Sequence, residues 1–540
     1  MNAKRHAASL LLGVLLAACT GTPVSPTPAP ASPAAPSPSA EASSPTATPA
    51  SPMATPTANP TPGPTPTLPT VPPATAAPPP GSPTPPVSAH GWPVAGATDP
   101  VFGRDGTVYA VVRTRDETPY AIVALDDGGH LKPGWPVRLS APASEVGLAA
   151  GRDGSLYATI CEPSAAGCGL HHFTANGRVP RGWPLSLSGM TGCSAPLVGS
   201  DGAVYATCVA RPDDPDPDTG LTGADPTTGL TIAADPASGA RAGWPVHYGG
   251  DALAIAPDGT LYVNAWQSNW EGGAPMTVAA FAPDGTLRPG WPRSWPADAF
   301  ASVRLAPDGT LYAWWYEDRQ EGEGGFGAKR TLYAAIGTDG RTLPGWPRSS
   351  TGAASSPAFG ADGTLYYDAD SGDVYARGRK GAVKPGWPVR GVGGSQVAVS
   401  PPYVSPEGSI LVLDAHVVTW LSPGGRALSS WGPGRSGSLS YCTGGATGCA
   451  ERVSAAPVFA PDRTVYILVW VTDGETWNVD TEIAALDRHG DVKPGWPRPA
   501  PGLDLAGPEG AWLRVGPDGR VYVVGSKGLY ALLPDGTLAT

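Results

Sequence analysis

Two short motifs alternate along the chain from about Ala89 to Thr540 and divide it into repeats of roughly 40 to 60 residues. Such self-similarity is the signature of a repeat architecture, in which each unit buries its apolar surface against its neighbours. The first motif is Gly-Trp-Pro, and its tryptophan recurs nine times when Trp431, in Ser-Ser-Trp-Gly-Pro, is counted with the others. The tryptophans are Trp92, Trp135, Trp183, Trp244, Trp291, Trp346, Trp387, Trp431 and Trp496.

The second motif is an Asp-Gly pair between an apolar stretch and a small–apolar–Tyr sequence. Such a pair between apolar runs predicts a β-hairpin with a type I′ turn, in which both central residues have positive φ. The motif also recurs nine times, with a substitution in two of the pairs. The nine pairs are Asp105-Gly106, Asp153-Gly154, Asp201-Gly202, Asp258-Gly259, Asp308-Gly309, Asp362-Gly363, Glu407-Gly408, Asp462-Arg463 and Asp518-Gly519.

The repeat from Ser356 to Trp387 shows what each unit folds into. It reads SPAFGADGTLYYDADSGDVYARGRKGAVKPGW, in which two strands flank Asp-Gly, Asp-Val-Tyr-Ala-Arg forms a third, and the end leads into a fourth. No amphipathic helical pattern of 11 or more residues follows the N-terminal apolar segment. Four-stranded antiparallel units stacked radially bury both sheet faces and leave only short edges. The sequence therefore predicts an all-β fold, a single β-propeller of four-stranded blades.

The two ends of the repeat region predict how the ring closes. The last unit ends at Leu529-Tyr530-Ala-Leu-Leu-Pro-Asp535-Gly536 and a short tail without Gly-Trp-Pro, whereas the first Gly91-Trp92-Pro93 precedes any blade of its own. We therefore expect the N- and C-terminal strands to share one blade, which holds both chain ends in place. The count is then nine blades.

The repeat resembles that of the pyrroloquinoline-quinone-like propellers. Ala124-Leu125-Asp126 before Trp135 and Ala485-Leu486-Asp487 before Trp496 carry the resemblance most closely, and it extends over about Ala89 to Thr540. It implies that the tryptophans dock between neighbouring blades, and eight blades, the commoner number in that family, is the alternative to nine. Integrin-like FG-GAP blades also use Pro-Gly-Trp-Pro, but their calcium loops are missing from the repeated positions of this sequence.

The N-terminus predicts export and lipid anchoring. Lys4, Arg5 and His6 precede an apolar run from Leu10 to Leu16, which is shorter than the roughly 20 residues of a membrane-spanning helix. Leu-Ala-Ala-Cys19 then resembles the lipobox of bacterial lipoproteins. The resemblance implies cleavage before Cys19 and acylation of Cys19, with palmitate among its acyl chains, so that the protein is held on a membrane. An ordinary secretory signal that happens to contain a cysteine is the alternative.

A stalk is predicted to follow. From Thr20 to about Ser88 nearly every residue is Pro, Thr, Ser or Ala, with Glu41 the only charge. Such a segment cannot bury enough surface to offset its ordering entropy, and its prolines favour extended polyproline II. The predicted organisation is a signal peptide over 1–18, the lipidated cysteine and disordered stalk over 19–88, and the propeller over 89–540.

The other six cysteines fall into local pairs, which indicates disulfides formed in an oxidising exterior compartment. The predicted pairs are Cys161 with Cys168, Cys193 with Cys208, and Cys442 with Cys449. Zinc is the alternative, but no Cys-x-x-Cys or His-x-x-x-His spacing accompanies these cysteines. We therefore expect a protein anchored to the cell membrane and facing the extracellular or periplasmic side.

Charge and motifs argue against several functions. The formal net charge is −11 and no Lys/Arg cluster occurs beyond the signal, so nucleic acid is not an expected partner. Quinone-dependent dehydrogenases hold their cofactor with calcium, a catalytic Asp and, in some members, adjacent cysteines, and the chain has no adjacent cysteines. It also contains no Gly-x-Ser-x-Gly, His-Glu-x-x-His or P-loop. We expect no catalytic residue.

Two groups of residues are candidate metal ligands, although no cofactor is otherwise expected. Asp214, Asp216, Asp218 and Asp225 fall at positions 1, 3, 5 and 12 of a calcium-type loop. Its glycine is at position 7 rather than 6, and a solvated acidic loop is the alternative. His171-His172 follows Cys168 on a predicted third strand, where exposed edge residues and a metal pair are the two interpretations.

Aromatic residues outside the repeat motifs supply a candidate ligand site on one face. They lie at or just past the second strand of three blades, and packing between blades would account for about half of them. Trp270 and Trp477 have polar neighbours and are the two most expected to be exposed. The candidates are Trp266, Trp270, Trp314, Trp315, Trp470 and Trp477, with Tyr316 beside them.

These features together predict a non-catalytic binding or interaction module for a glycan or protein ligand. The absence of a catalytic constellation and the aromatic face are its basis. An envelope assembly scaffold is one alternative, although the long stalk argues against a role at the membrane surface. A quinone-type or polysaccharide-active enzyme is the other.

Overall fold

Every described element of the chain is a β-strand. The structure, a computed structural model, describes residues 87, 89–114, 116–140, 143–162, 167–210, 229–266, 276–295, 301–322, 325–369, 371–392, 401–413, 417–431, 450–453, 457–472, 479–499, 512–525 and 528–539. All of them belong to one unit, Pro62–Thr540. Within these ranges no helix is long and apolar enough to cross a membrane. The predicted signal peptide, Cys19 and the stalk, apart from Val87, lie outside the described residues.

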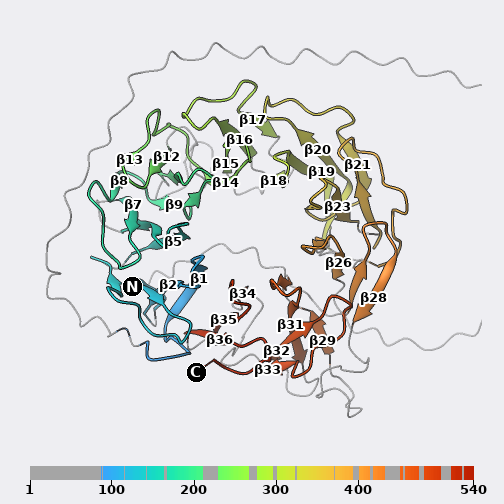
Figure 1. Ribbon diagram of the computed structural model, residues 1–540. Helices are drawn as coiled ribbons and strands as arrows, with labels where there is room; N and C mark the ends of the chain where they lie inside the picture. Colours follow the sequence, from blue (N-terminus) through green and yellow to red (C-terminus); the bar gives the residue numbers. More distant parts are fainter. Residues whose placement is uncertain are drawn as a thin grey trace, which may run out of the picture. The chain divides into compact units, whose positions relative to one another are not determined.

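The strands form nine antiparallel sheets that follow one another around a ring (Figure 1). We number the sheets as blades 1 to 9, starting from β1 (Ala97–Phe102). In each blade the chain proceeds from a first strand near the centre of the ring to later strands at its periphery (Figure 1). The predicted propeller is therefore confirmed, with nine blades rather than eight.

The strand bounds follow one plan in every blade, with two first strands broken into two pieces that pair with the same second strand. The first strands are β1, β5 (Glu145–Ala150), β9 (Gly192–Cys193) with β10 (Leu197–Val198), β14 (Asp251–Ile255), β18 (Ser302–Leu305), β22 (Ala358–Phe359), β25 (Tyr403–Val404), β29 (Ala450–Val453) with β30 (Val458–Phe459), and β34 (Trp512–Val515). The second strands are β2 (Val108–Arg113), β6 (Leu156–Cys161), β11 (Val204–Val209), β15 (Leu261–Trp266), β19 (Leu311–Gly322), β23 (Leu365–Asp368), β26 (Ile410–Leu413), β31 (Val465–Thr472) and β35 (Val521–Gly525).

The third and fourth strands complete the blades. The third strands are β3 (Pro119–Leu125), β7 (Cys168–Phe173), β12 (Leu230–Asp235), β16 (Met276–Phe281), β20 (Gly325–Ile336), β24 (Val374–Arg377), β27 (Val418–Leu421), β32 (Val479–Leu486) and β36 (Gly528–Leu532). The fourth strands are β4 (Val137–Arg138), β8 (Leu185–Leu187), β13 (Gly239–Ala240), β17 (Arg293–Trp295), β21 (Arg348–Thr351), β28 (Ala427–Trp431) and β33 (Arg498–Pro499).

In blades 6 and 9 a single bridging residue takes the place of the fourth strand. Val389 pairs with Val374 in blade 6, and Val94 pairs with Leu529 in blade 9. Val94 and Leu529 exchange both backbone hydrogen bonds, at 2.9 and 3.0 Å. The residue that completes the last blade therefore comes from before the first blade. The predicted closure of the ring by both ends of the repeat region is confirmed.

The core consists of nine buried apolar clusters, one at each interface between neighbouring blades. Successive residues of a strand point to opposite faces of its sheet, so both faces must be apolar where blades lie on both sides. In β2, Val108 and Ala110 pack towards blade 9, whereas Tyr109 between them packs towards blade 2. Continuous apolar second strands follow from this arrangement.

The motif tryptophans lie at these interfaces, and all nine are buried, at 2–8% exposure. Eight of them donate an Nε1 hydrogen bond to a backbone carbonyl in the third-to-fourth-strand turn of the next blade, at 2.8–3.3 Å. Trp135, for example, donates to Ala175 O at 3.0 Å and packs edge-on against Tyr109 of its own blade. The expected docking of the tryptophans between blades is confirmed.

Trp431 in blade 7 is buried like the others but makes no such bond. Its Nε1 is buried without a hydrogen-bond partner. Gly432 replaces the proline that follows the other eight tryptophans, and Leu411 stands where the other blades have the packing tyrosine. The interface between blades 7 and 8 therefore retains the apolar contact without the polar one.

This difference predicts unequal effects of one substitution. Trp135→Phe removes the indole N–H and leaves the Ala175 carbonyl unpaired, whereas Trp431→Phe removes apolar area and an N–H that has no partner. We expect Trp135→Phe to lower the free energy of unfolding by about 1 kcal/mol more than Trp431→Phe does. Equilibrium urea unfolding followed by circular dichroism measures the difference. Equal losses would show that the hydrogen bond contributes nothing to the ring.

Candidate functional site

The two faces of the ring differ in how much their connections vary. In antiparallel blades the first-to-second and third-to-fourth turns lie on one face, the turn face, and the remaining connections lie on the other, the loop face. The nine first-to-second turns all span five residues, from 103–107 in blade 1 to 516–520 in blade 9. The second-to-third connections span two to twenty residues. The first-to-second turns are therefore constant in length, and the second-to-third connections are not.

The turn face is built from self-contained turns. Gly103 N–H donates to Thr107 O at 2.8 Å, and Asp105 Oδ1 accepts the Thr107 N–H at 3.1 Å. Gly106 has a φ of 83°, but no aspartate of the repeated pairs has a positive φ among the described residues. The predicted type I′ turn is therefore wrong, because the aspartate closes the turn with its side chain and a single left-handed residue suffices.

Salt bridges on the turn face join the turn aspartate to the residue three positions before the tryptophan. Both partners are partly exposed, so each pair contributes little to stability. Arg379 adds a bridge to Asp308 of the preceding blade, at 3.0 Å. The pairs within one blade are Lys132–Asp105, Arg241–Asp201, Arg288–Asp258, Lys384–Asp362 and Lys493–Asp462, at 2.9–3.1 Å.

The hydrogen bonds of the turn face lower the pKa of four of the aspartates described above. Partial burial by itself would raise the pKa of Asp362, but hydrogen bonds from Thr364 and Lys384 outweigh it and lower this pKa to about 2. The pKa values of Asp105, Asp258 and Asp462 are lowered in the same way. These carboxylates are therefore charged and bonded at neutral pH.

The lowered values predict an acid-sensitive fold. A carboxylate whose folded pKa lies below its unfolded value of about 3.9 stabilises the fold above that pH. Its contribution is lost as the pH falls through the folded pKa, which is about 2 for Asp362. We expect the urea midpoint to fall between pH 5 and pH 2.5, and to fall less in Asp362→Asn. An unchanged pH dependence in this variant would contradict the assignment.

A cavity of about 520 Å³ opens between blades 9 and 1 on the turn face. Its charged groups pair with one another, Lys132 with Asp105 at 3.1 Å and Arg520 with Asp518 at 3.2 Å and Asp127 at 3.7 Å. The charged side chains of the cavity therefore already form ion pairs within the fold. Its lining is Asp105, Gly106, Thr107, Asp126, Asp127, Lys132, Asp518, Arg520, Leu533 and Pro534.

The loop face holds those predicted ligand-binding aromatics that the structure describes. Trp314 and Trp315 are neighbours on β19 and point to opposite faces of blade 5. Trp314 is only 8% exposed and packs into the cluster between blades 5 and 6, while Trp315 is half-buried against the cluster between blades 4 and 5. The Tyr316 hydroxyl donates to Ala354 O at 3.2 Å. Trp314 is therefore a packing residue, which corrects its place in the predicted platform.

The remaining candidates are distributed around the ring. Trp266 ends β15 of blade 4, opposite Met276, and Trp470 lies in β31 of blade 8, opposite Thr481. Blades 4 and 5 are neighbours, but blade 8 is separated from them by two blades on its nearer side. The described backbone therefore does not bring the three aromatic blades together. Trp270, Trp477 and the predicted calcium ligands Asp214, Asp216, Asp218 and Asp225 lie outside the described residues.

Blade 5 carries a hairpin that sequence reasoning missed. β19 and β20 each have 12 residues, whereas the other second strands have four to eight. The pairing of β18 with β19 stops at Trp314, and that of β21 with β20 stops at Arg330. Residues 319–322 and 325–328 therefore pair only with each other in the described structure. The hairpin extends past its own blade on the loop face.

The two adjacent histidines do not form a metal pair. His172 is 5% exposed, and its ring stacks on Tyr157 with centroids 4.6 Å apart. His171 faces the other side of β7, because neighbouring strand residues point in opposite directions. Burial lowers the pKa of His171 to about 4. The expectation of exposed edge residues is therefore wrong for His172, since this strand lies between two blades.

Two of the three predicted disulfides are present. Cys161 is bonded to Cys168, and Cys193 is bonded to Cys208. Each joins two paired strands of one blade near the loop face, in blades 2 and 3 respectively. Local pairing is therefore confirmed for these four cysteines, while Cys442 and Cys449 lie outside the described residues.

No protein-family model matches the chain, and no curated protein matches it either. Solved structures with a similar course of the chain include a eukaryotic initiation factor, with 12% identity, a TM-score of 0.44, and coverage of 75% of this chain and 88% of that one. BamB from Moraxella catarrhalis has 14% identity, a TM-score of 0.35, and coverage of 81% and 98%. Hydrazine synthase from Kuenenia stuttgartiensis has 13% identity, a TM-score of 0.35, and coverage of 74% and 97%.

These likenesses are too weak to transfer a function. All three have TM-scores below 0.5 and identities of 12–14%. The class of the protein follows instead from its own geometry, a ring of nine four-stranded blades closed by residues from both ends of the repeat region. The chain is a nine-bladed β-propeller.

Proposed function

We propose that this chain is a lipid-anchored surface protein whose propeller binds a glycan or protein ligand through its loop face, without catalysis. The observation that carries the proposal is the contrast between the faces. The first-to-second turns have five residues in all nine blades, whereas the second-to-third connections range from two to twenty. Functional residues gather on variable connections that a rigid scaffold positions.

The side chains and backbone of the turn face are already engaged in holding the ring together. Eight motif tryptophans bond to its third-to-fourth turns, and its aspartates pair with a Lys or Arg of the same blade in six blades. A change in turn length would move the carbonyl that accepts the indole N–H. The loop face is free of this constraint, because the docking bonds lie at the other end of the blades.

Blades 4 and 5 are the proposed centre of binding. The long β19–β20 hairpin rises there, and Trp315 beside it is only half-buried. Trp266 ends the second strand of the neighbouring blade, and Trp270 follows four residues later. Aromatic rings provide flat apolar surfaces on which sugar rings and protein side chains pack. Blade 8, with Trp470 and Trp477, offers a second and separate aromatic position.

The ligand class can be tested with the full-length mature protein on a glycan array. We expect selective binding that Trp270→Ala weakens at least about tenfold, the scale on which central aromatic contacts act. Trp477→Ala reports on the second position. Arg341→Ala is the matched control, because this side chain lies on the turn face and is 88% exposed. No selective binding, or binding unaffected by both tryptophan substitutions, would contradict the glycan form of the proposal.

The anchor has its own test. The N-terminal sequence supports export through Lys4, Arg5 and the apolar run, and acylation through Cys19. The thiol of Cys19 is the group that would be acylated. We expect Cys19→Ser to abolish incorporation of a palmitate analogue and to move the protein from the detergent phase to the aqueous phase in a detergent partition. Labelling that persists in the variant would contradict the lipobox.

A further inference from the structure

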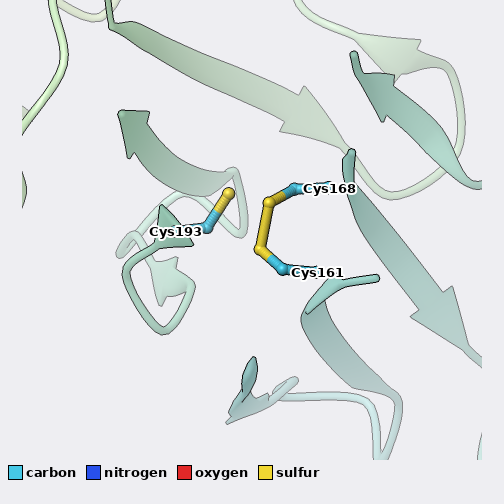
Figure 2. Close-up of side chains that lie close together, drawn as sticks. All are labelled: Cys161, Cys168 and Cys193. Carbon is cyan, nitrogen blue, oxygen red and sulfur yellow. A yellow bond between two sulfur atoms is a disulfide. The ribbon is translucent and has the colours of Figure 1, made fainter. Parts of the chain in front are cut away.

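The two described disulfides face each other across the interface between blades 2 and 3. Cys161 and Cys168 close the loop-face end of β6 and β7, and Cys193 and Cys208 join β9 to β11. All four belong to one buried cluster, with exposures of 0–6%. Figure 2 shows the Cys161–Cys168 disulfide with the sulfur of Cys193 beside it. Two covalent links that belong to different blades are therefore in contact.

The sulfur positions suit exchange between these links. The Sγ atoms of Cys161, Cys168 and Cys193 all lie within 4.8 Å of one another, so Cys193 is close to both sulfurs of the neighbouring disulfide. Disulfides exchange when a thiolate attacks a disulfide sulfur and displaces its partner. We propose that these three cysteines form a thiol–disulfide exchange site, which converts a disulfide within a blade into one between blades 2 and 3.

The reaction begins when a dithiol small enough to reach the buried Cys193–Cys208 bond transfers two electrons and two protons to it and is itself oxidised to a disulfide. The Cys193 thiolate then attacks Sγ of Cys168 or Cys161. A new disulfide bond forms between Cys193 and the attacked cysteine, and the Cys161–Cys168 bond breaks. The displaced thiolate takes up a proton. This second step changes neither the number of disulfides nor the oxidation state of the protein.

Burial determines which thiols take part. With exposures of 0–6%, the four cysteines are shielded from bulky thiols in solution, whereas the neighbouring disulfide is already in contact. A thiol generated here therefore has an internal partner within reach. The Cys161–Cys168 pair, held at the ends of two paired strands, presents both of its sulfurs to that thiol.

Exchange would change which strands the disulfide holds together. In the described state each disulfide holds two strands of one blade together, and Cys208 lies one residue before the end of β11, where the twenty-residue connection to β12 begins. After exchange the link joins two blades, and Cys208 no longer holds the base of that connection. The site thus couples a reductant to the loop face, independently of whether the loop face binds the proposed ligand.

Two variants of the full-length mature protein break the same disulfide and leave different thiols. Cys208→Ser leaves the Cys193 thiol beside Cys161–Cys168, whereas Cys193→Ser leaves the Cys208 thiol, which is not one of the three mutually close sulfurs. After alkylation and non-reducing peptide mapping, we expect label on Cys161 or Cys168 in Cys208→Ser, exceeding that in Cys193→Ser roughly tenfold. Peptides linking Cys193 to Cys161 or Cys168 should accompany it.

Label confined to Cys193 in the first variant, or equal label on Cys161 and Cys168 in both variants, would overturn the proposal.

A third variant, Cys161→Ser, tests the reverse exchange, because it leaves the Cys168 thiol beside Cys193–Cys208. There we expect a Cys168–Cys193 link and label on Cys208. Matching far-ultraviolet circular dichroism of the variants and the parent protein shows that the ring is retained, and label confined to Cys168 in Cys161→Ser would also count against exchange.

Discussion

The buried motif tryptophan between one blade and the next is the feature on which the ring depends. In a repeat architecture each unit contacts only its neighbours, so the stability of the ring depends on its nine interfaces. At eight of them a buried tryptophan packs against its own tyrosine and donates to a carbonyl of the next turn. The apolar surface drives the contact, and the directional bond fixes how far one blade is rotated against the next.

The same bond ties the turn face to the ring. The acceptor carbonyl must lie at hydrogen-bond distance from the indole, so the backbone that carries it cannot move without breaking the contact. At the other end of the blades no bond of this kind is repeated among the described residues. The hairpin of blade 5 and the twenty-residue connection of blade 3 are both found there. Rigidity and variability are therefore separated in space within each repeat.

The fold could be predicted from the sequence because its motifs repeat. The places where a blade departs from the repeat could not be predicted. Nine tryptophans and nine turn pairs predicted nine blades, and the unpaired Gly91-Trp92-Pro93 predicted that both ends of the repeat region share one blade, which the pairing of Val94 with Leu529 confirms. The missing bond of Trp431 and the burial of Trp314 depend on what the neighbouring blade places opposite, which strand alternation alone does not reveal. Local spacing likewise predicted two disulfides but not that their sulfurs meet, because they belong to different repeats.

The closure through Val94 gives the ring a defined mechanical weak point. A pull on the chain N-terminal to Ala89 is transmitted to His90, which bridges to His130 of blade 1, and then to Trp92 and Val94, the residues that complete blade 9 from outside. Val94 is held there by two backbone hydrogen bonds to Leu529, and Trp92 by its bond to Asp127 O of blade 1 at 3.1 Å. Tension would load these few contacts before any other blade, so the propeller would open at its own seam.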